Sequence, residues 1–424
     1  MPKRTLLKDW VSRVVGAVNT SFADTDRSSY GELHPDVVAW PGSVEEISSV
    51  LQTAHDANAE VAVAGSGSRT RERWPKRNNG KRADDQRPRI VLDTSRLTNI
   101  LEVDETSQLV ECQTGLELRH LEEALRRHGL TLGPFPDSIF TSTLGGVLGD
   151  PPPLAYSSLR GPLHGSCLGV TTVTPLGNVI ATRVAPRRAV GPDISRLYIG
   201  SGATLGVLVS AVIRVYSLPE TNMARAFLFP SAASALECAR EMLAHDMRPA
   251  RLRVMANEHS AGEVVMKQFP AQAALTLVFE GCAELVELDA RRAEEIAAEH
   301  SGSELPQQLA DHWAERYPDP NPEHLCHAWA PVRHSTAVAA GKAAADVLGN
   351  TVHGISYDQF SPHGCHMWLS VPEEVDKERL AEACTSAGLS PRGRRHTHAR
   401  QHPLTQRLRQ QLDPTRMMLS PEWD

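Results

Sequence analysis

Two short segments in the second half of the chain carry side chains that suit the oxidation of a small anionic alcohol. Arg333 and His334 are adjacent in the segment CHAWAPVRHST. A guanidinium can bind a carboxylate or phosphate through two parallel hydrogen bonds, and a neighbouring imidazole can take the proton of a hydroxyl group. The pair predicts a substrate anchor and a base, with an ordinary surface pair as the alternative.

The segment SYDQFSPHGCHMWLS adds Tyr357, His363 and His366. In a strand, His366 and Trp368 share a face because successive side chains alternate. Tyr357 and His366 are therefore taken as further catalytic candidates, with either His334 or His366 as the base.

Three histidines, His396, His398 and His402, follow in the segment GRRHTHARQH. Such a group can join a divalent metal site, while exposed or stacked histidines are the alternative. We predict no metal here.

Three glycine-bearing segments earlier in the chain suit the close approach of backbone to a ligand. They are AGSGSRT at 64–70, STLGGVLGD at 142–150 and GSGATLGVL at 200–208. Glycine tolerates positive φ and has no side chain, so its backbone N–H groups can surround a pyrophosphate. The first segment alone is equally compatible with an ordinary turn.

Hydrophobic periodicity predicts the elements that position these segments. Ser43 and Glu46 indicate a capping box before a helix over about 44–57. An N-terminal helix is expected to pack through one row of apolar residues, namely Leu6, Trp10, Val14 and Val18. Strands are expected at 60–64, 90–93, 109–113 and 207–216, with a hairpin over 169–182. From 221 to about 390, strands and helices alternate as in a separate α+β domain.

In this order, PGSVEEISSVL, the AGSGSRT turn, STLGGVLGD and GSGATLGVLVSAVIRVYSLPE resemble the FAD-binding domain of the vanillyl-alcohol oxidase/p-cresol methylhydroxylase superfamily. The resemblance implies an α+β protein with a two-subdomain, p-cresol methylhydroxylase-type FAD-binding domain and an α+β cap domain. The cap would cover the flavin ring and supply the substrate-binding side chains. The expected ranges are 1–220, with 391–424 returning, for the FAD domain and 221–390 for the cap.

The same resemblance implies which residues contact FAD. Carried over by position, they are Gly65, Ser66, Gly67, Ser68, Arg69, Ser142, Thr143, Gly145, Gly146, Thr204, Gly206 and Val207. Non-covalent FAD is expected, because the glycine turn contains no histidine for attachment and Cys167 suits a buried core position.

Three places depart from the superfamily pattern. Ser68-Arg69-Thr70 replaces Gly-Thr-Ser, and Asp150-Pro151-Pro152-Pro153 replaces the small residues expected after Thr-Leu-Gly-Gly. Gly202-Ala203 stands where Glu-Gly is typical.

Composition favours small-molecule chemistry. The 424 residues carry a net charge of -7, which offers no general attraction to nucleic acid or anionic membranes. No apolar run is long enough to span a bilayer, and the seven cysteines lack a CxxC pair, so a reducing cytoplasm is expected. A homodimer or partner subunits are compatible with the sequence.

We predict an FAD-dependent oxidase or dehydrogenase that oxidises a hydroxylated carbon of a small 2-hydroxy acid or related alcohol by hydride transfer to flavin. Two alternatives stay open. The segments LDTSRLTNILEVDE and PDSIFTSTLGG resemble alkyldihydroxyacetonephosphate synthase, which implies non-redox, flavin-dependent alkyl transfer, whereas LRQQLDPTRMMLSP resembles glycolate oxidase FAD subunits. The altered loops are also compatible with a non-catalytic subunit of a larger flavoprotein complex.

Overall fold

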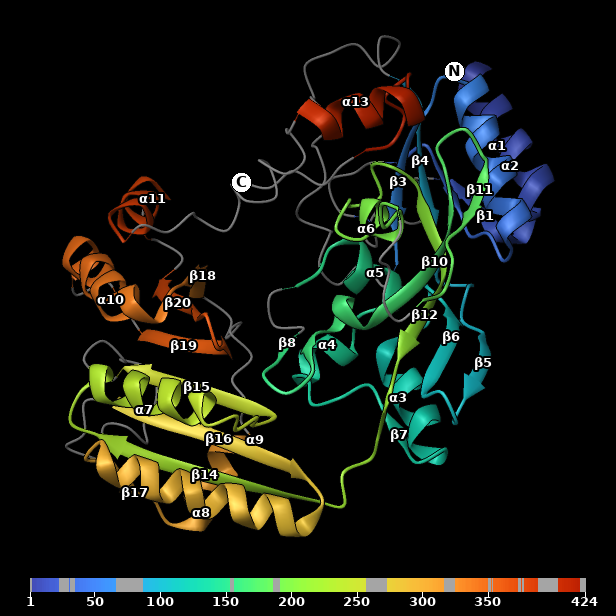
Figure 1. The fold of residues 1–424 in the computed structure, drawn as a ribbon. Coiled ribbons are helices and arrows are strands. Elements are labelled where there is room, and N and C mark those ends of the chain that lie inside the picture. Colours follow the sequence, from blue (N-terminus) through green and yellow to red (C-terminus); the bar gives the residue numbers. More distant parts are fainter. Residues whose placement is uncertain are drawn as a thin grey trace. The chain divides into compact units, whose positions relative to one another are not determined.

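The chain forms two compact units in the computed structural model (Figure 1). The structure describes residues 2–22, 30, 35–65, 87–152, 156–185, 191–256, 273–315, 325–349, 352, 354–372, 375, 377–387 and 403–419. Unit 1 comprises Met1–Ala155, Pro162–Ser217 and Thr397–Asp424, and unit 2 comprises Tyr156–Gly161 and Leu218–His396. The junction at Ser217 lies three residues before the expected boundary at 220, and the short excursion at Tyr156–Gly161 was not anticipated.

Unit 1 contains a four-stranded sheet with the order β1-β2-β4-β3, in which β2, β4 and β3 run parallel. The strands are β1 (Thr20–Phe22), β2 (Val37–Ala39), β3 (Glu60–Ala64) and β4 (Arg89–Asp93). The segment after helix α13 (Pro403–Leu412) returns to this sheet. Val61 N donates to Met417 O (2.9 Å) and Leu419 N donates to Val61 O (2.8 Å), so the chain's last described residues extend the sheet.

Two helices of unit 1 test the helix predictions. Helix α2 (Val44–Asp56) starts at the Ser43 cap, whose side chain accepts from Glu46 N, while the Glu46 carboxylate accepts from Gly42 N rather than from Ser43 N. Helix α1 (Pro2–Val15) buries a different row from the expected one, which was wrong. Leu7, Val11 and Val15 are buried, whereas Leu6 is 50% exposed. Both rows are apolar, and packing against α2 selects between them.

The second sheet of unit 1 is antiparallel and has the order β11-β10-β12-β6-β5. Its strands are β5 (Ile100–Asp104), β6 (Leu109–Gln113), β10 (Cys167–Val173), β11 (Val179–Ala181) and β12 (Val207–Arg214). The smaller elements of the unit are η1 (Ala17–Asn19), α3 (Leu118–Arg127), α4 (Asp137–Phe140), α5 (Leu144–Gly149), η4 (Leu163–Ser166), α6 (Ser195–Tyr198) and the pair β7 (Leu130–Thr131) with β13 (Tyr216–Ser217). The predicted hairpin over 169–182 is confirmed as β10 and β11.

Unit 2 is built on a seven-stranded antiparallel sheet with the order β17-β14-β16-β15-β19-β20-β18. The strands are β14 (Thr221–Phe229), β15 (Arg251–Ala256), β16 (Ala273–Gly281), β17 (Ser303–Glu304), β18 (Leu325–Val332), β19 (Gly354–Ser361) and β20 (Gly364–Pro372). The other elements are α7 (Ala232–Ala244), α8 (Ala283–Glu299), α9 (Gln307–Glu315), α10 (His334–Leu348), α11 (Lys377–Ser386), β8 (Tyr156–Ser157) and β9 (Gly161–Pro162), of which Pro162 falls in unit 1.

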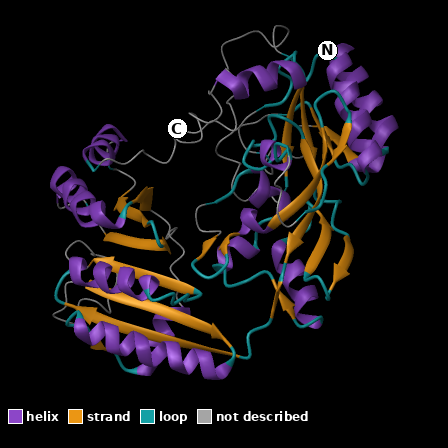
Figure 2. Ribbon diagram, viewed as in Figure 1, coloured by secondary structure: helices purple, strands orange, loops and turns teal. Residues whose placement is uncertain are grey.

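The two faces of this sheet differ in chemistry. Helices α7, α8, α10 and α11 cover one face and bury its apolar side chains in the larger core of the unit (Figure 2). On the opposite face, α9 packs over β14 and β16 through a smaller apolar cluster that includes Trp313. Polar side chains of β15, β19 and β20 occupy this second face, which we call the polar face and define by Arg253, Ser356, Asp358, Gln359, His366 and Trp368.

Candidate functional site

The first two glycine-bearing segments meet directly in unit 1. Gly65 follows the end of β3, and a Cβ placed on it would lie 2.5 Å from the Thr143 hydroxyl oxygen. Thr143 caps α5, where its hydroxyl accepts from Gly146 N at 3.1 Å. Gly65 therefore has room only for hydrogen against this capping threonine. The other predicted contacts of the first segment, Ser66, Gly67, Ser68 and Arg69, lie outside the described residues.

Thr114 connects the second segment to strand β12, and the sequence reasoning missed it. Gly145 N donates to Thr114 O at 2.7 Å, and a Cβ on Gly145 would lie 3.0 Å from the Thr114 side chain. The Thr114 hydroxyl in turn donates to Leu208 O at 2.7 Å. A threonine immediately after a predicted strand was the available signal, but nothing in its spacing distinguishes it from other threonines.

The third segment is tied to the end of α5. Gly200 N donates to Leu148 O (2.9 Å) and Gly202 N donates to Gly149 O (2.8 Å). Gly206 has φ +155, and a Cβ there would lie 2.7 Å from Val173 O, so this position requires glycine. All three segments thus converge within unit 1.

The remaining predicted contacts have structural roles as well. Thr204 is buried and its hydroxyl donates to Ser201 O, while Ser142 O accepts from Leu118 N. The Val207 side chain is buried in a core cluster that contains apolar residues of both sheets. Only the backbone of Val207 could therefore contact a ligand. Glycines pressed against neighbouring backbone leave these loops without side chains, so a cofactor could approach their backbone closely. The N–H groups of Gly145, Gly146, Gly200, Gly202 and Gly206 already donate within the protein.

The proline-rich departure lies where the second and third segments meet. Asp150 ends α5 and is buried, and its N–H donates to Gly146 O at 3.1 Å. Pro151 follows, with its Cδ 3.8 Å from the position that a Gly200 Cβ would occupy. Pro153 lies outside the described residues. The prolines remove backbone donors from this loop, so any ligand hydrogen bond here must come from its neighbours.

The departure at Gly202-Ala203 places an alanine in a conformation that favours glycine. Ala203 has φ +63, in the left-handed region. We expect Ala203→Gly to raise the free energy of unfolding by about 0.5–1 kcal/mol, because the strain of about 1–2 kcal/mol outweighs the larger entropy of unfolded glycine. Denaturant unfolding measures the change. Ala57→Gly is the control, since Ala57 has φ −79 and the same change should destabilise there. A loss of stability at both positions would contradict the prediction.

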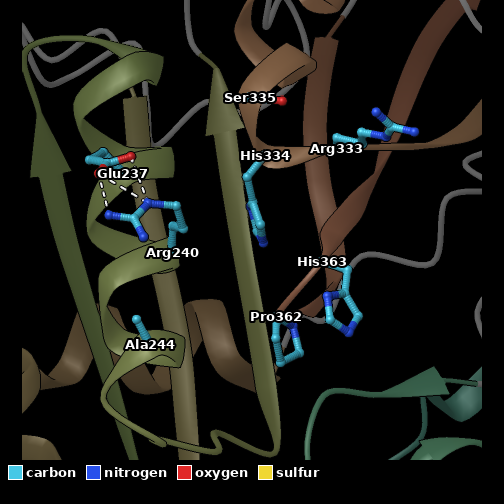
Figure 3. Close-up of a pocket in the computed structure, with 8 residues that line it drawn as sticks. All are labelled: Glu237, Arg240, Ala244, Arg333, His334, Ser335, Pro362 and His363. Atoms are coloured by element: carbon cyan, nitrogen blue, oxygen red, sulfur yellow. Dashed lines mark hydrogen bonds and ion pairs between the residues drawn. The ribbon is translucent and has the colours of Figure 1, made fainter.

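Arg333 and His334 lie on the helix-covered side of unit 2. Arg333 is the N-cap of α10 and His334 its first residue. They line a pocket of about 670 Å³ together with α7 and the turn between β19 and β20 (Figure 3). The His334 ring stacks on Phe360, with ring centroids 6.1 Å apart, and its Nε2 donates to Ser361 O at 2.8 Å. Figure 3 shows the Arg333 side chain extending away from the His334 ring.

On the α7 side of this pocket, the two charged residues form an ion pair with each other. Arg240 donates to both carboxylate oxygens of Glu237, with the shortest contact at 2.6 Å, and this hydrogen bonding lowers the pKa of Glu237. Both groups are exposed, so the pair contributes little to stability. The pocket therefore has the character of a solvated surface rather than a buried reaction site.

His366 lies on the other side of the same sheet. Cys365 and Met367 belong to the core beneath the helices, and alternation along β20 directs His366 and Trp368 to the polar face. The structure thus places His366 and His334 on opposite sides of the sheet. Tyr357 is placed in the core at 2% exposure, where its hydroxyl donates to Ala337 O at 3.2 Å. Tyr357 thus lies in the core under the helices, on the opposite side of the sheet from His366.

The polar face contains a buried ionic group that sequence reasoning missed. Trp368 Nε1 donates to Asp358 Oδ1 at 2.6 Å, and Arg253 Nη2 donates to Ser356 Oγ at 3.1 Å. Burial raises the pKa of Asp358 to about 6, against the opposing effects of the Arg253 charge and the Trp368 hydrogen bond. Arg253 Nε is buried without a hydrogen-bond partner among the described residues. An orphaned guanidinium donor costs free energy unless a ligand satisfies it.

No group of three or more metal-ligating side chains occurs in the part of the chain that the structure describes. His396, His398 and His402, the histidines considered for a metal, lie outside it. No helix in the described ranges is long and apolar enough to cross a membrane.

The fold and the converging loops define a two-domain flavoprotein of the p-cresol methylhydroxylase type. The model of the FAD binding domain matches residues 35–183, and that of the C-terminal domain of FAD linked oxidases matches residues 218–347. The chain therefore belongs to the FAD-linked oxidases. Its fold superimposes on substrate-bound p-cresol methylhydroxylase with a TM-score of 0.73 at 12% identity, covering 98% of this chain and 95% of that one.

Two curated relatives illustrate the range of the family. Alkyldihydroxyacetonephosphate synthase from Caenorhabditis elegans is 31% identical over 224 residues, covering 53% of this chain and 37% of the relative. Glycolate oxidase subunit GlcD from Bacillus subtilis is 25% identical over 261 residues, covering 59% of this chain and 53% of the relative. The chain thus matches about half or less of the length of these relatives.

Proposed function

We propose that this protein oxidises a hydroxylated carbon of a small 2-hydroxy acid or related alcohol by hydride transfer to non-covalently bound FAD. The observation that carries the proposal is the buried Arg253 Nε, which has no hydrogen-bond partner among the described residues and lies on the same face of the sheet as His366. An anionic substrate would satisfy the guanidinium, and the imidazole would accept the hydroxyl proton. This pair replaces Arg333 and His334 as the proposed anchor and base.

The residues proposed to hold FAD are the three converging segments of unit 1, including Gly65, Thr143, Gly145 and Gly206. When bound, FAD supplies the two-electron acceptor for the hydride. Arg253 would fix the substrate carboxylate, so that the hydroxylated carbon has one orientation, and His366 would hold the released proton.

Alkyl transfer is the second candidate, favoured by the 31% identity to alkyldihydroxyacetonephosphate synthase. It uses the same anion anchor but leaves the substrate without net oxidation. A role as one subunit among several is a third proposal, supported by the name of the Bacillus subtilis relative. The cytoplasm remains the predicted compartment.

Anaerobic titration tests the proposed oxidation. The purified protein should be yellow, and acid precipitation should release its colour into the supernatant, because the FAD is expected to be non-covalent. Adding the correct 2-hydroxy acid without oxygen should bleach the flavin absorption, since the hydride reduces FAD. A yellow protein that no hydroxylated acid or alcohol bleaches would favour alkyl transfer. A colourless protein that cannot be reconstituted with FAD would contradict both enzymatic proposals.

A further inference from the structure

Asp358 is buried beside the Arg253 guanidinium of the polar face. The residue is 4% exposed, and its Oδ1 accepts from Trp368 Nε1 at 2.6 Å. The ladder of β15 and β19 pairs Val254 with Tyr357, both of which lie in the core. Arg253 and Asp358, the next residues of the two strands, therefore both point to the polar face. Burial raises the pKa of Asp358 to about 6, and the Arg253 charge opposes this rise.

Other titratable or charged groups near Asp358 come from the two neighbouring strands. His366 on β20 lies opposite Asp358 in the ladder, and Cys365 precedes it with its side chain in the core. Burial raises the pKa of Cys365 to about 12, with a smaller effect of the Asp358 charge, so this thiol stays neutral. On β15, Arg251 shares the face of Arg253, and its Nη1 donates to the backbone of α9 at 3.0 Å. Of these groups, only Asp358 and His366 can change charge near neutral pH.

A carboxylate bound to Arg253 would disturb the charge balance at Asp358. Arg253 Nε is buried and has no hydrogen-bond partner among the described residues, so it is the donor proposed for the anion. The anion adds a second negative charge beside one guanidinium. Two carboxylates that share one site do not both ionise easily, and the arginine cannot change its charge. Protonation of Asp358 restores the balance.

We propose that Asp358 takes up one proton from solvent when an anionic substrate binds to Arg253. The proposal rests on the proposed function, in which Arg253 anchors the substrate carboxylate. The site then binds a singly charged anion together with a proton. The hydrogen bond from Trp368 does not oppose this change, because a protonated carboxyl group retains acceptor capacity.

The affinity for the anion is therefore expected to fall as the pH rises. The pKa of Asp358 is about 6 in the free protein and should be higher with the anion bound. Affinity is then constant below pH 6, falls above it, and becomes constant again above the pKa of the bound state. If binding raises this pKa by about one pH unit, the affinity at high pH is about tenfold lower than at low pH.

Nitrogen NMR of the full-length protein labelled with ¹⁵N-tryptophan follows the ionisation of Asp358 through the indole N–H of Trp368, which donates to it. Trp368→Phe identifies the signal by its loss. Formate is the probe, because it is the smallest carboxylate and has no hydroxylated carbon to oxidise. Saturating formate should raise the midpoint of the Trp368 titration by about one pH unit in the wild type. Arg253→Met should remove this effect, and its midpoint without formate should be higher than that of the wild type.

The outcomes distinguish the proton uptake from the proposed anchor. If formate binds to the wild type and not to Arg253→Met, but the Trp368 midpoint does not move, the proton uptake is wrong and the anchor stands. If formate binds equally well to both proteins, or to neither, the anchor and the proton uptake are both wrong. This readout needs no variant of Asp358, so it does not depend on how such a variant folds.

Calorimetric titration with formate, in buffers that differ in their heat of ionisation, counts the protons directly. At pH 7 the wild type should take up about 0.4 proton per formate bound, for a rise of about one pH unit in the pKa of Asp358. Asp358→Asn should take up none and should bind formate with an affinity independent of pH. His366→Asn is the matched control, since the second titratable group is removed and the uptake should remain. Uptake that persists in Asp358→Asn and disappears in His366→Asn would assign the proton to the imidazole and overturn the proposal.

Discussion

Replacing Arg253 with methionine is expected to lower kcat/KM for the oxidised 2-hydroxy acid by about 10²- to 10³-fold. Truncating one partner of a buried, hydrogen-bonded charge pair costs about 2–5 kcal/mol, and the substrate carboxylate is the proposed partner of the orphaned Nε. Steady-state kinetics measure the loss, and KM should carry much of it. Arg253→Lys should recover only part of the affinity, because an ammonium lacks the planar fork of donors.

Arg333→Met is the matched control for this prediction. Arg333 lies at the start of α10, on the helix-covered side of the sheet, and its removal should change kcat/KM by less than about twofold. The absorption spectrum of FAD and the thermal midpoint should be checked in both variants, because Arg253 also contacts Ser356. A large loss in Arg333→Met with little change in Arg253→Met would return the anchor to the pocket and overturn the proposed site.

Replacing His366 with asparagine is expected to lower kcat by about 10²- to 10⁴-fold, the usual contribution of a positioned general base. KM should change little, because the imidazole is proposed to act on the hydroxyl proton rather than on the carboxylate. Rapid-mixing measurements of flavin bleaching isolate the chemical step from reoxidation. The residual rate should also lose the pH dependence that the base gives to the wild type.

His334→Asn distinguishes this role from that of the other candidate base. His334 Nε2 donates to Ser361 O and its ring stacks on Phe360, so its loss should lower the free energy of unfolding by about 1 kcal/mol and leave kcat nearly unchanged. If His334→Asn abolished bleaching while His366→Asn preserved it, the reaction site would lie on the helix-covered side instead.

The local elements of the fold were largely predictable because their signals are short in range. The Ser43 cap predicted the start of α2, and alternation of apolar residues predicted β6 with the bounds Leu109–Gln113 that the structure shows. These features depend on residues within one or two turns of each other, so no knowledge of distant contacts was needed.

The buried face of α1 shows where local reasoning fails. Leu6 and Trp10 form one apolar row, and Leu7 and Val11 form the next. Periodicity cannot choose between adjacent rows of similar hydrophobicity. Contacts with α2 decide which row is buried, and strands β1 and β2 lie between α1 and α2 in the sequence.

The loops proposed to hold FAD were identified from their order along the chain, but their arrangement is tertiary. Gly65 and Thr143 are 78 positions apart, and only the folded chain places the glycine against the capping hydroxyl. Thr114, which bridges the second segment to β12, has no distinguishing sequence context. Ala203 has a left-handed backbone conformation, which favours glycine. This conformation explains why the superfamily pattern has glycine at this position.

By itself, the sequence determined the family, the two-part organisation and the segments that are candidates for the cofactor, because glycine turns and periodic strands are local patterns with a characteristic order. Only the tertiary structure decided which chemically suitable side chains meet. Antiparallel pairing places β15 and β20 on either side of β19, so that Arg253, Asp358 and His366 share one face of the sheet. The same alternation sends Tyr357 into the core and leaves Arg333 and His334 on the opposite side. Proximity across strands depends on sheet order and register, which are set by contacts between residues far apart in the chain.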